Sequence, residues 1–227
     1  MRNWIIGLAA LGCLAACNNS TSTIESKALN SQLDSVAYSI GVNVGKNMQV
    51  QKMDDVDPAI VAAAINDVLK DNELKITEDD IRTVIGDYQK AKFEELKEEN
   101  KEKGATFLAE NKDKEGVFTT ESGLQYKVIV DGNGPKPTLN DRVSCHYEGK
   151  LLDGTVFDSS IQRGTPSEFN VNGVIAGWTE ALQLMPVGSK WELYIPYEIA
   201  YRENGNGRGI GPAETLLFEL ELLDIVN

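Results

Sequence analysis

Histidine and cysteine, which often carry acid–base, nucleophilic or metal chemistry, are scarce in this 227-residue chain. His146 is the single histidine, so the pattern of residues supports neither a Ser/His/Asp triad nor a zinc site. Two of the three cysteines, Cys13 and Cys17, lie near the N-terminus, which leaves Cys145 alone in the rest of the chain. With no second thiol to pair with, Cys145 is expected to be a small buried apolar residue that forms no disulfide.

A glycine-rich stretch, RENGNGRGIGPAE, invites a phosphate-loop interpretation. It lacks the GxxxxGK[ST] pattern and leads into a strand-like run, TLLFELELL, instead of a helix. We therefore expect Gly205 to Gly211 to form a mobile loop that overhangs a binding pocket. The formal net charge of −13 argues against nucleic acid as a partner, because phosphate binding needs a basic face.

The stretch Arg142 to Ser160, RVSCHYEGKLLDGTVFDSS, carries the clearest structural signal. It predicts two strands, Val143 to Leu152 and Thr155 to Phe157. The dipeptide Asp153-Gly154 between them favours the positive φ angles of a tight turn. The first strand alternates apolar and polar residues, so its apolar side chains should share one face: Val143, Cys145 and Tyr147.

A domain of one sheet and one helix is predicted from about Val117 to the end of the chain. Further strands are expected at Leu124 to Val130, Glu168 to Val171, Lys190 to Ile195 and Thr215 to Val226. One helix falls between them, with apolar residues at helical spacing: Ile175, Trp178, Leu182 and Met185. A helix laid across a curved antiparallel sheet is an α+β arrangement.

Several runs in this region follow one another in a recognisable order: HYEG, DGTVFDSS, RGTP, VIAGWTEALQLMPVGSKWELYIP and AYRENGNGRGIGPAETLLFELELLDI. Together they closely resemble an FKBP-type peptidyl-prolyl isomerase domain, nearly continuously from about Gly123 to Val226. The residues before this domain resemble the Mip-like subfamily of bacterial envelope isomerases, in which a helical dimerisation domain comes first. The resemblance implies the FKBP-like fold and peptidyl-prolyl cis-trans isomerase activity, with no cofactor and no metal.

This chemistry suits a region poor in titrating groups. The cis and trans forms of an X-Pro bond differ by only about 0.5 to 1 kcal/mol, but the barrier between them is about 18 to 20 kcal/mol. A twisted amide has lost its resonance and carries less charge on oxygen, so a dry apolar site stabilises it. Neither a nucleophile nor a general acid or base is required.

The resemblance implies a pocket of aromatic and aliphatic residues. Its catalytic residues would be Tyr147, Phe157, Asp158, Trp178 and Tyr201. Its substrate-binding residues would be Phe169, Val174, Ile175, Arg163, Ile210 and Phe218. Each aromatic residue taken alone could equally belong to an ordinary core.

The resemblance also implies a role for particular groups in this pocket. Trp178 would be the floor on which the proline ring stacks, and the Ile175 N–H and Tyr201 hydroxyl would donate to substrate carbonyls. Asp158, paired with Arg163, would polarise or support the edge of the pocket and would transfer no proton. One departure from the commoner pattern, Arg202 in place of glycine, leaves peptide preference and affinity for macrolide inhibitors open.

The N-terminus resembles a bacterial lipoprotein signal peptide covering residues 1–16. Arg2 precedes an apolar core, and Leu14-Ala15-Ala16-Cys17 resembles a lipobox. The mature chain would begin at Cys17, which would carry lipid, and residues 17–30 would be a flexible tether to the membrane. The expected location is the outer membrane of a Gram-negative-type bacterium, facing the periplasm. The alternative is an ordinary secretory signal with a chance cysteine.

Residues 31–89 predict three amphipathic helices. Their starts are marked by capping residues: Ser31 with Asp34, Asp57 with Pro58, and Thr77 with Asp80. Three short helices bury too little apolar surface to form a stable domain alone. We therefore expect a homodimer through residues 31–89. The alternative is that they pack back on the C-terminal domain.

The run KAKFEELKEENKEKGATFLAENKDKEG, residues 90–116, predicts a solvated spacer helix rich in Lys and Glu, which Gly104 could interrupt or bend. Residues 117–227 complete the chain as the isomerase domain. Its expected substrates are proline-containing unfolded envelope polypeptides, whose folding it would assist. A rival hypothesis is a chaperone that holds such proteins between two separated pockets with little isomerisation. A third, surface adhesion, rests on the lipid anchor alone.

Overall fold

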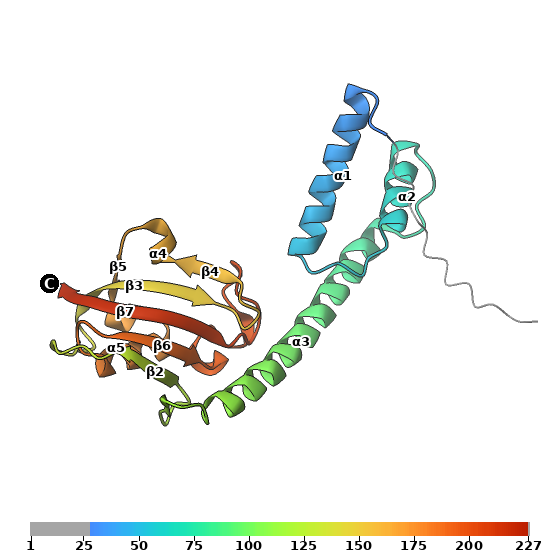
Figure 1. Cartoon of the computed structure of the whole chain (residues 1–227). Coiled ribbons are helices and arrows are strands. Elements are labelled where there is room, and N and C mark those ends of the chain that lie inside the picture. Colours follow the sequence, from blue (N-terminus) through green and yellow to red (C-terminus); the bar gives the residue numbers. More distant parts are fainter. Residues whose placement is uncertain (1–27, 227) are drawn as a thin grey trace, which may run out of the picture. The chain divides into compact units, whose positions relative to one another are not determined.

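The computed structural model of this protein describes residues 28–226 (Figure 1). The expected signal peptide, Cys17 and most of the expected tether lie outside the described residues. The chain divides into two compact units, one ending at Ile81 and the other beginning at Arg82. No helix of residues 28–226 is both long enough and apolar enough to cross a bilayer.

The N-terminal unit contains the helices α1 (Gln32–Val50) and α2 (Pro58–Leu69) and the start of α3 (Glu78–Asn111). Each predicted helix start is confirmed. The Ser31 hydroxyl accepts a hydrogen bond from the Asp34 N–H at 3.1 Å and caps α1. The Asp57 carboxylate accepts from the Ala59 N–H at 2.8 Å and caps α2, while the Thr77 hydroxyl accepts from the Asp80 N–H at 3.2 Å.

The N-terminal unit does not bury its apolar residues. No residue of α1 or α2 is buried, and Leu33 and Leu69 are each 79% exposed. A cavity of about 530 Å³ lies between α2 and the start of α3, and apolar side chains such as Ile60 and Val68 line much of it. The expectation that these helices make a poor core by themselves is therefore confirmed.

The helix α3 runs without a break for 34 residues, from Glu78 to Asn111. It continues past the expected boundary at residue 89 and through Gly104, and it ends before residue 116. Its buried residues, Asn100, Gly104 and Asn111, are spaced so that they share one face.

That face of α3 packs against the rest of the C-terminal unit. The Asn100 side-chain amide donates to the Pro212 carbonyl at 2.9 Å, and the Asn111 amide donates to the Gln125 side chain at 3.0 Å. A Cβ atom at Gly104 would lie 2.3 Å from the Thr215 hydroxyl oxygen, so this contact admits only glycine without rearrangement. The prediction of a purely solvated spacer is wrong for this part of the helix, because its charged residues occupy only the remaining faces.

The C-terminal unit is built on an antiparallel sheet of seven strands in the order β1-β2-β6-β7-β3-β4, with β5 also paired to β3 (Figure 1). The strands are β1 (Val117–Thr119), β2 (Gln125–Val130), β3 (Arg142–Lys150), β4 (Val156–Ser159), β5 (Ser167–Asn170), β6 (Lys190–Ile195) and β7 (Leu216–Val226). The predicted strands are confirmed within a few residues. The sequence analysis missed β1 and the short helix α4 (Ser160–Arg163).

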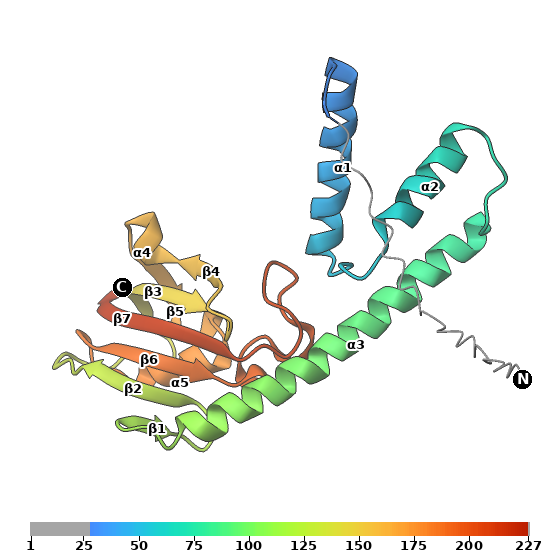
Figure 2. The ribbon, with the colours of Figure 1, turned by 45° about the vertical axis from the view of Figure 1, so that its right-hand side comes forward.

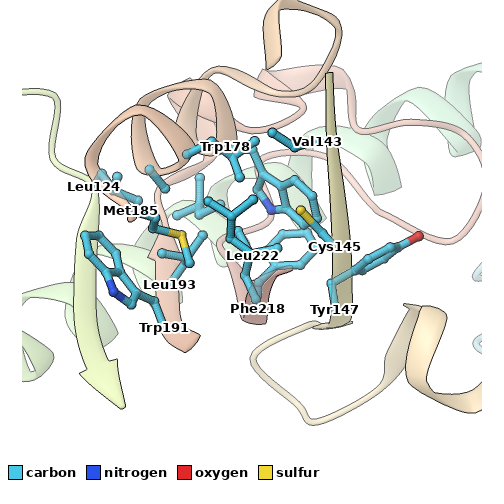
Figure 3. Packing of buried hydrophobic residues seen from close by; sticks show 14 of the residues in the cluster. Leu124, Val143, Cys145, Tyr147, Trp178, Met185, Trp191, Leu193, Phe218 and Leu222 are labelled. Carbon is cyan, nitrogen blue, oxygen red and sulfur yellow. The ribbon is translucent and has the colours of Figure 1, made fainter. Parts of the chain in front are cut away.

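The core lies between this sheet and the helix α5 (Ala176–Leu184) (Figure 3). Val143, Cys145 and Tyr147 of β3 are buried as predicted, and they contribute to the same core as Trp178 and Leu182 of α5. Three short 3-10 segments complete the unit: η1 (Val171–Gly173), η2 (Tyr197–Ile199) and η3 (Arg202–Asn204). The α+β arrangement is confirmed.

The turn between β3 and β4 differs in detail from the prediction. The Gly154 N–H donates to the Leu151 carbonyl at 3.0 Å, and the positive φ angle is confined to Gly154, at 87°. Asp153 acts through its side chain instead, which accepts from the Thr155 N–H at 2.8 Å. A register shift after Gly149 also ends regular pairing earlier than the alternation of residues suggested.

Candidate functional site

A cavity of about 370 Å³ opens at one end of the core of the C-terminal unit. Its walls come from β3, β4, β5 and β7, from the end of η1 and the segment that leads into α5, from α5 itself, and from the residue before η3. The lining residues are Tyr147, Phe157, Asp158, Phe169, Gly173, Val174, Ile175, Trp178, Tyr201 and Phe218. The structure thus brings together every predicted site residue of this unit except Arg163 and Ile210, and it adds Gly173.

Trp178 is the centre of an aromatic cluster in this cavity (Figure 3). Its ring meets three others edge to face, with centroid distances of 5.3 Å to Tyr147, 5.4 Å to Phe169 and 5.2 Å to Phe218. Such arrangements are favourable because the positive edge of one ring lies on the negative face of another. Trp178 is only 4% exposed, so its ring is held in place by these neighbours.

Gly149 is a residue of the site that the sequence analysis did not single out. It pairs with Asp158 on one side and with Phe218 on the other. A Cβ atom at this position would lie 2.6 Å from the Phe157 ring and 2.7 Å from the Phe218 ring. A glycine inside a predicted strand is the available signal for such a close approach.

Three polar side chains form one edge of the cavity. The Tyr147 hydroxyl donates to the Asp158 carboxylate at 2.5 Å, and the Arg163 guanidinium forms an ion pair with the same carboxylate. Arg163 also donates to the Tyr147 oxygen at 2.9 Å and to the Ser167 hydroxyl at 3.2 Å. The predicted pairing of Asp158 with Arg163 is confirmed, and Arg163 holds the edge of the cavity without lining it.

The charges and hydrogen bonds at this edge fix the protonation states of Asp158 and Tyr147. Partial burial alone would raise the pKa of Asp158, but the hydrogen bonds from Tyr147 and Arg163 outweigh it and hold that pKa below its usual value. Burial and the neighbouring Asp158 carboxylate raise the pKa of Tyr147. At neutral pH Asp158 is therefore ionised and Tyr147 is protonated, an arrangement suited to positioning and not to proton transfer.

Two hydrogen-bond donors at the cavity have no partner within residues 28–226. Ile175 precedes α5, and its carbonyl accepts from the N–H groups of Trp178 at 2.9 Å and Thr179 at 3.0 Å. The Ile175 N–H itself donates to no group in that range, and neither does the hydroxyl of Tyr201, a residue that is 39% exposed. Both groups are thus free to donate to a bound carbonyl.

Ile210 and the glycine-rich loop lie elsewhere than expected. Ile210 is 3% exposed and belongs to the hydrophobic core, and no residue of 205–211 lines the cavity. The Asn206 side chain accepts from the N–H groups of Arg208 and Ile210 at 2.8 and 3.0 Å, so the loop folds back on itself. The loop lies beside α3 (Figure 2), where Lys101 pairs with Glu203 at 2.8 Å. The prediction that it overhangs the pocket is therefore wrong.

Other chemistry finds little support in the part of the chain that the structure describes. Cys145 is fully buried, as predicted, and burial raises the pKa of its thiol to about 12, so it is no nucleophile at neutral pH. Within residues 28–226 no three His, Cys, Asp or Glu side chains are grouped as a metal site would require.

Comparison with known families agrees with this geometry. Residues 134–223 match the model of the FKBP-type peptidyl-prolyl cis-trans isomerase, and residues 33–128 match the model of the domain amino terminal to it. The chain is 42% identical to "Outer membrane protein MIP" of Legionella longbeachae, over 97% of this chain and 94% of that protein. It is 46% identical to the FKBP-type 22 kDa peptidyl-prolyl cis-trans isomerase of Escherichia coli K12, over 84% and 94%.

A solved structure gives the same result for the fold. The crystal structure of FkpA from Escherichia coli matches with a TM-score of 0.66 and 33% sequence identity, and the match covers 87% of this chain and 98% of that one.

Proposed function

This chain belongs to the FKBP-type peptidyl-prolyl cis-trans isomerases and has their activity, and we propose that it catalyses the rotation in the aromatic cavity around Trp178. The observation that carries this placement is the combination of a dry aromatic floor with two unpaired donors at its rim. A prolyl peptide has an apolar ring to bury and neighbouring carbonyl groups to hydrogen-bond, and rotation of its amide needs no proton-transfer group.

In the proposed mechanism the proline ring stacks on Trp178, between Tyr147 and Phe218. The Ile175 N–H donates to a carbonyl of the substrate, and the Tyr201 hydroxyl is a second donor. Removal from water favours the twisted amide, because its oxygen carries less charge than that of the planar amide. Asp158 and Arg163 act through Tyr147, which they hold by hydrogen bonds. Ile210 supports the core beneath the site and contacts no substrate.

The proposed assembly is a homodimer through residues 31–89, with residues 117–227 as the isomerase domain. The lack of any buried residue in α1 and α2 supports it, because a second copy would cover the faces that one copy leaves exposed. The second half of α3 belongs structurally to the isomerase domain, since Asn100 and Asn111 hydrogen-bond to it.

The proposed substrates are unfolded, proline-containing proteins of the bacterial envelope. We place this protein there, anchored by lipid on Cys17 in the outer membrane and facing the periplasm. The lipobox-like sequence supports this placement, as does a relative whose name is "Outer membrane protein MIP".

The test measures isomerisation of a short X-Pro peptide by the full chain and by a double variant, Phe157→Leu with Asp158→Leu. The double variant removes one wall of the cavity and the acceptor of the Tyr147 hydroxyl, while Arg163 keeps its hydrogen bonds to Tyr147 and Ser167. The proline ring then loses a wall, and Tyr147 loses a hydrogen bond that orients it. We expect kcat/KM to fall by at least about tenfold, which corresponds to about 1.4 kcal/mol of transition-state stabilisation.

The matched control makes the same two changes away from the cavity, at the exposed Phe118 and at Asp131. Circular dichroism checks that all three proteins are folded. An equal rate in the cavity variant and the wild type would show that catalysis takes place elsewhere. A wild-type chain that binds unfolded protein but leaves the peptide unchanged would favour a chaperone.

A further inference from the structure

A second cavity, of about 560 Å³, adjoins the aromatic one. The two share Val174 and Ile175 as lining residues, so they open next to each other across the start of α5. The aromatic cavity is mainly apolar, whereas the second has five polar side chains in its lining: Thr179, Glu180, Gln183, Glu198 and Arg202. Neither the family models nor the names of the relatives assign a role to this second cavity.

A bound peptide has to extend beyond its proline. The following argument rests on the proposed placement of that proline on Trp178. An extended chain advances about 3.3 Å per residue, so the residues next to proline lie within one or two residue lengths of the aromatic cavity. Ile175, whose N–H is the proposed donor to a substrate carbonyl, lines both cavities. A peptide bound to this N–H would therefore place one residue next to its proline in the second cavity.

The second cavity is lined by more negative than positive side chains. Glu180 is half-buried, and its carboxylate accepts a hydrogen bond from the Ser122 hydroxyl at 2.5 Å, which fixes its position on α5. Glu198 is exposed in the middle of η2. Two carboxylates therefore face the solvent of this cavity, against one guanidinium, in a chain whose net charge is already −13.

Arg202 is the third charge, and its backbone is unusual. Its φ angle is 57°, in the left-handed region that a non-glycine residue enters at a cost of about 1 kcal/mol or more. Its guanidinium forms no ion pair within residues 28–226, although Glu180 and Glu198 line the same cavity. An arginine held next to Tyr201 in this conformation places a positive charge beside the substrate and partly offsets the two carboxylates.

We propose that the second cavity is a substrate subsite that favours a basic side chain next to the proline, with Glu180 and Glu198 attracting it and Arg202 limiting the preference. The interaction acts through partly exposed groups, so its effect is modest and sensitive to salt.

The test uses three peptides that differ only in the residue before proline, Lys, Gln or Glu, and three that differ only in the residue after it. We expect kcat/KM of the full chain to be higher for Lys than for Gln at one of these two positions, by about threefold at low ionic strength. The order should continue to Glu as the poorest substrate. The difference should shrink as salt is added.

Variants of the charged residues test whether the peptide preference arises in the second cavity. Glu180→Gln with Glu198→Gln should bring the Lys-to-Glu ratio below one, because the Arg202 guanidinium then remains without the two carboxylates that outweigh it. Arg202→Gly should increase the ratio. Ser122→Ala should lower the ratio slightly, because it releases the Glu180 carboxylate. Glu115→Gln removes the same charge from an exposed site outside both cavities and should change neither the rates nor the ratio.

Equal rates for the Lys and Glu peptides at both positions, with the Gln peptides turned over normally, would overturn the subsite and leave the proposed catalytic cavity intact. A preference for Glu would assign the dominant role to Arg202 and overturn the proposal as well. Loss of turnover of all six peptides by the wild-type chain would instead contradict the proposed function.

Discussion

The two units of this protein use the same apolar residue types in opposite ways. In the N-terminal unit Leu33 is 79% exposed and Ile60 is 68% exposed, whereas in the C-terminal unit Leu193 and Leu220 are fully buried. Burial contributes about 25 cal/mol for each Å² of apolar surface removed from water. The C-terminal unit therefore obtains its stability from its own core, whereas α1 and α2 of the N-terminal unit obtain little from the burial of their apolar residues.

The largest effect is expected from one matched pair of leucine truncations. Leu220→Ala, on the central strand β7, should lower the free energy of unfolding of the C-terminal unit by about 2 to 5 kcal/mol, because it leaves a cavity in a fully packed core. Leu33→Ala should change the stability of an isolated copy by less than about 0.5 kcal/mol. Denaturant unfolding followed by tryptophan fluorescence and by circular dichroism measures both.

Measurements at several protein concentrations test whether a second copy of the chain covers Leu33. If a second copy does, Leu33→Ala should weaken the dimer in sedimentation analysis and make unfolding more dependent on concentration. A chain that is monomeric at all accessible concentrations, with unchanged stability, would contradict the proposed homodimer.

The next effect concerns two glycines on the same helix, α3. Gly104→Ala should destabilise the C-terminal unit by about 1 to 3 kcal/mol, because the new Cβ atom would collide with Thr215. Gly86→Ala, where no atom lies within 4 Å, should instead stabilise the helix by up to about 1 kcal/mol. Thermal or chemical unfolding of the two variants should therefore give shifts of opposite sign.

Two outcomes would change the comparison between the units. A stabilising Gly104→Ala would show that α3 does not pack on the C-terminal unit in solution. A strongly destabilising Gly86→Ala would show that a partner approaches this part of the helix closely, which would support a dimer interface that includes residues 82–89.

The smallest effect concerns the polar edge of the catalytic cavity. The pKa of Asp158 is held below its ordinary value of 3.8, so its contribution to stability is fully present above that pH and disappears as the pH falls through the lower, folded-state pKa. Asp158→Asn should therefore destabilise the protein more at pH 7 than at pH 2.5. Urea unfolding of both proteins at the two pH values measures this, and an equal loss at both would show that the carboxylate charge has no part in stability.

Much of the secondary structure of both units could be predicted because its signals are local. Alternating burial along β3, the turn at Gly154 and the capping residues of α1 and α2 depend on neighbours within a few positions, which a single sequence contains. The residues of the proposed catalytic cavity, apart from Gly173, were assigned through the resemblance to a known family. The structure brings all of the assigned residues except Arg163 and Ile210 into its lining.

The features that the sequence analysis did not predict depend on contacts between distant parts of the chain. The charged run of α3 carries a buried stripe only because Pro212, Thr215 and Gln125 lie beside it. The glycine-rich loop has the composition of a mobile segment, but the Asn206 side chain folds it back on itself, away from the cavity. Position 149 requires glycine only because the Phe157 and Phe218 rings lie against it in the folded domain.

The sequence by itself determined where helices and strands begin, which faces are apolar and, through its motifs, which family the chain belongs to. Only the tertiary structure decided which apolar faces are covered, which glycines lie against side chains and which charges line the same cavity. The physical reason is that capping, alternation and turn formation act between near neighbours, whereas burial and electrostatics depend on distances that the fold alone sets.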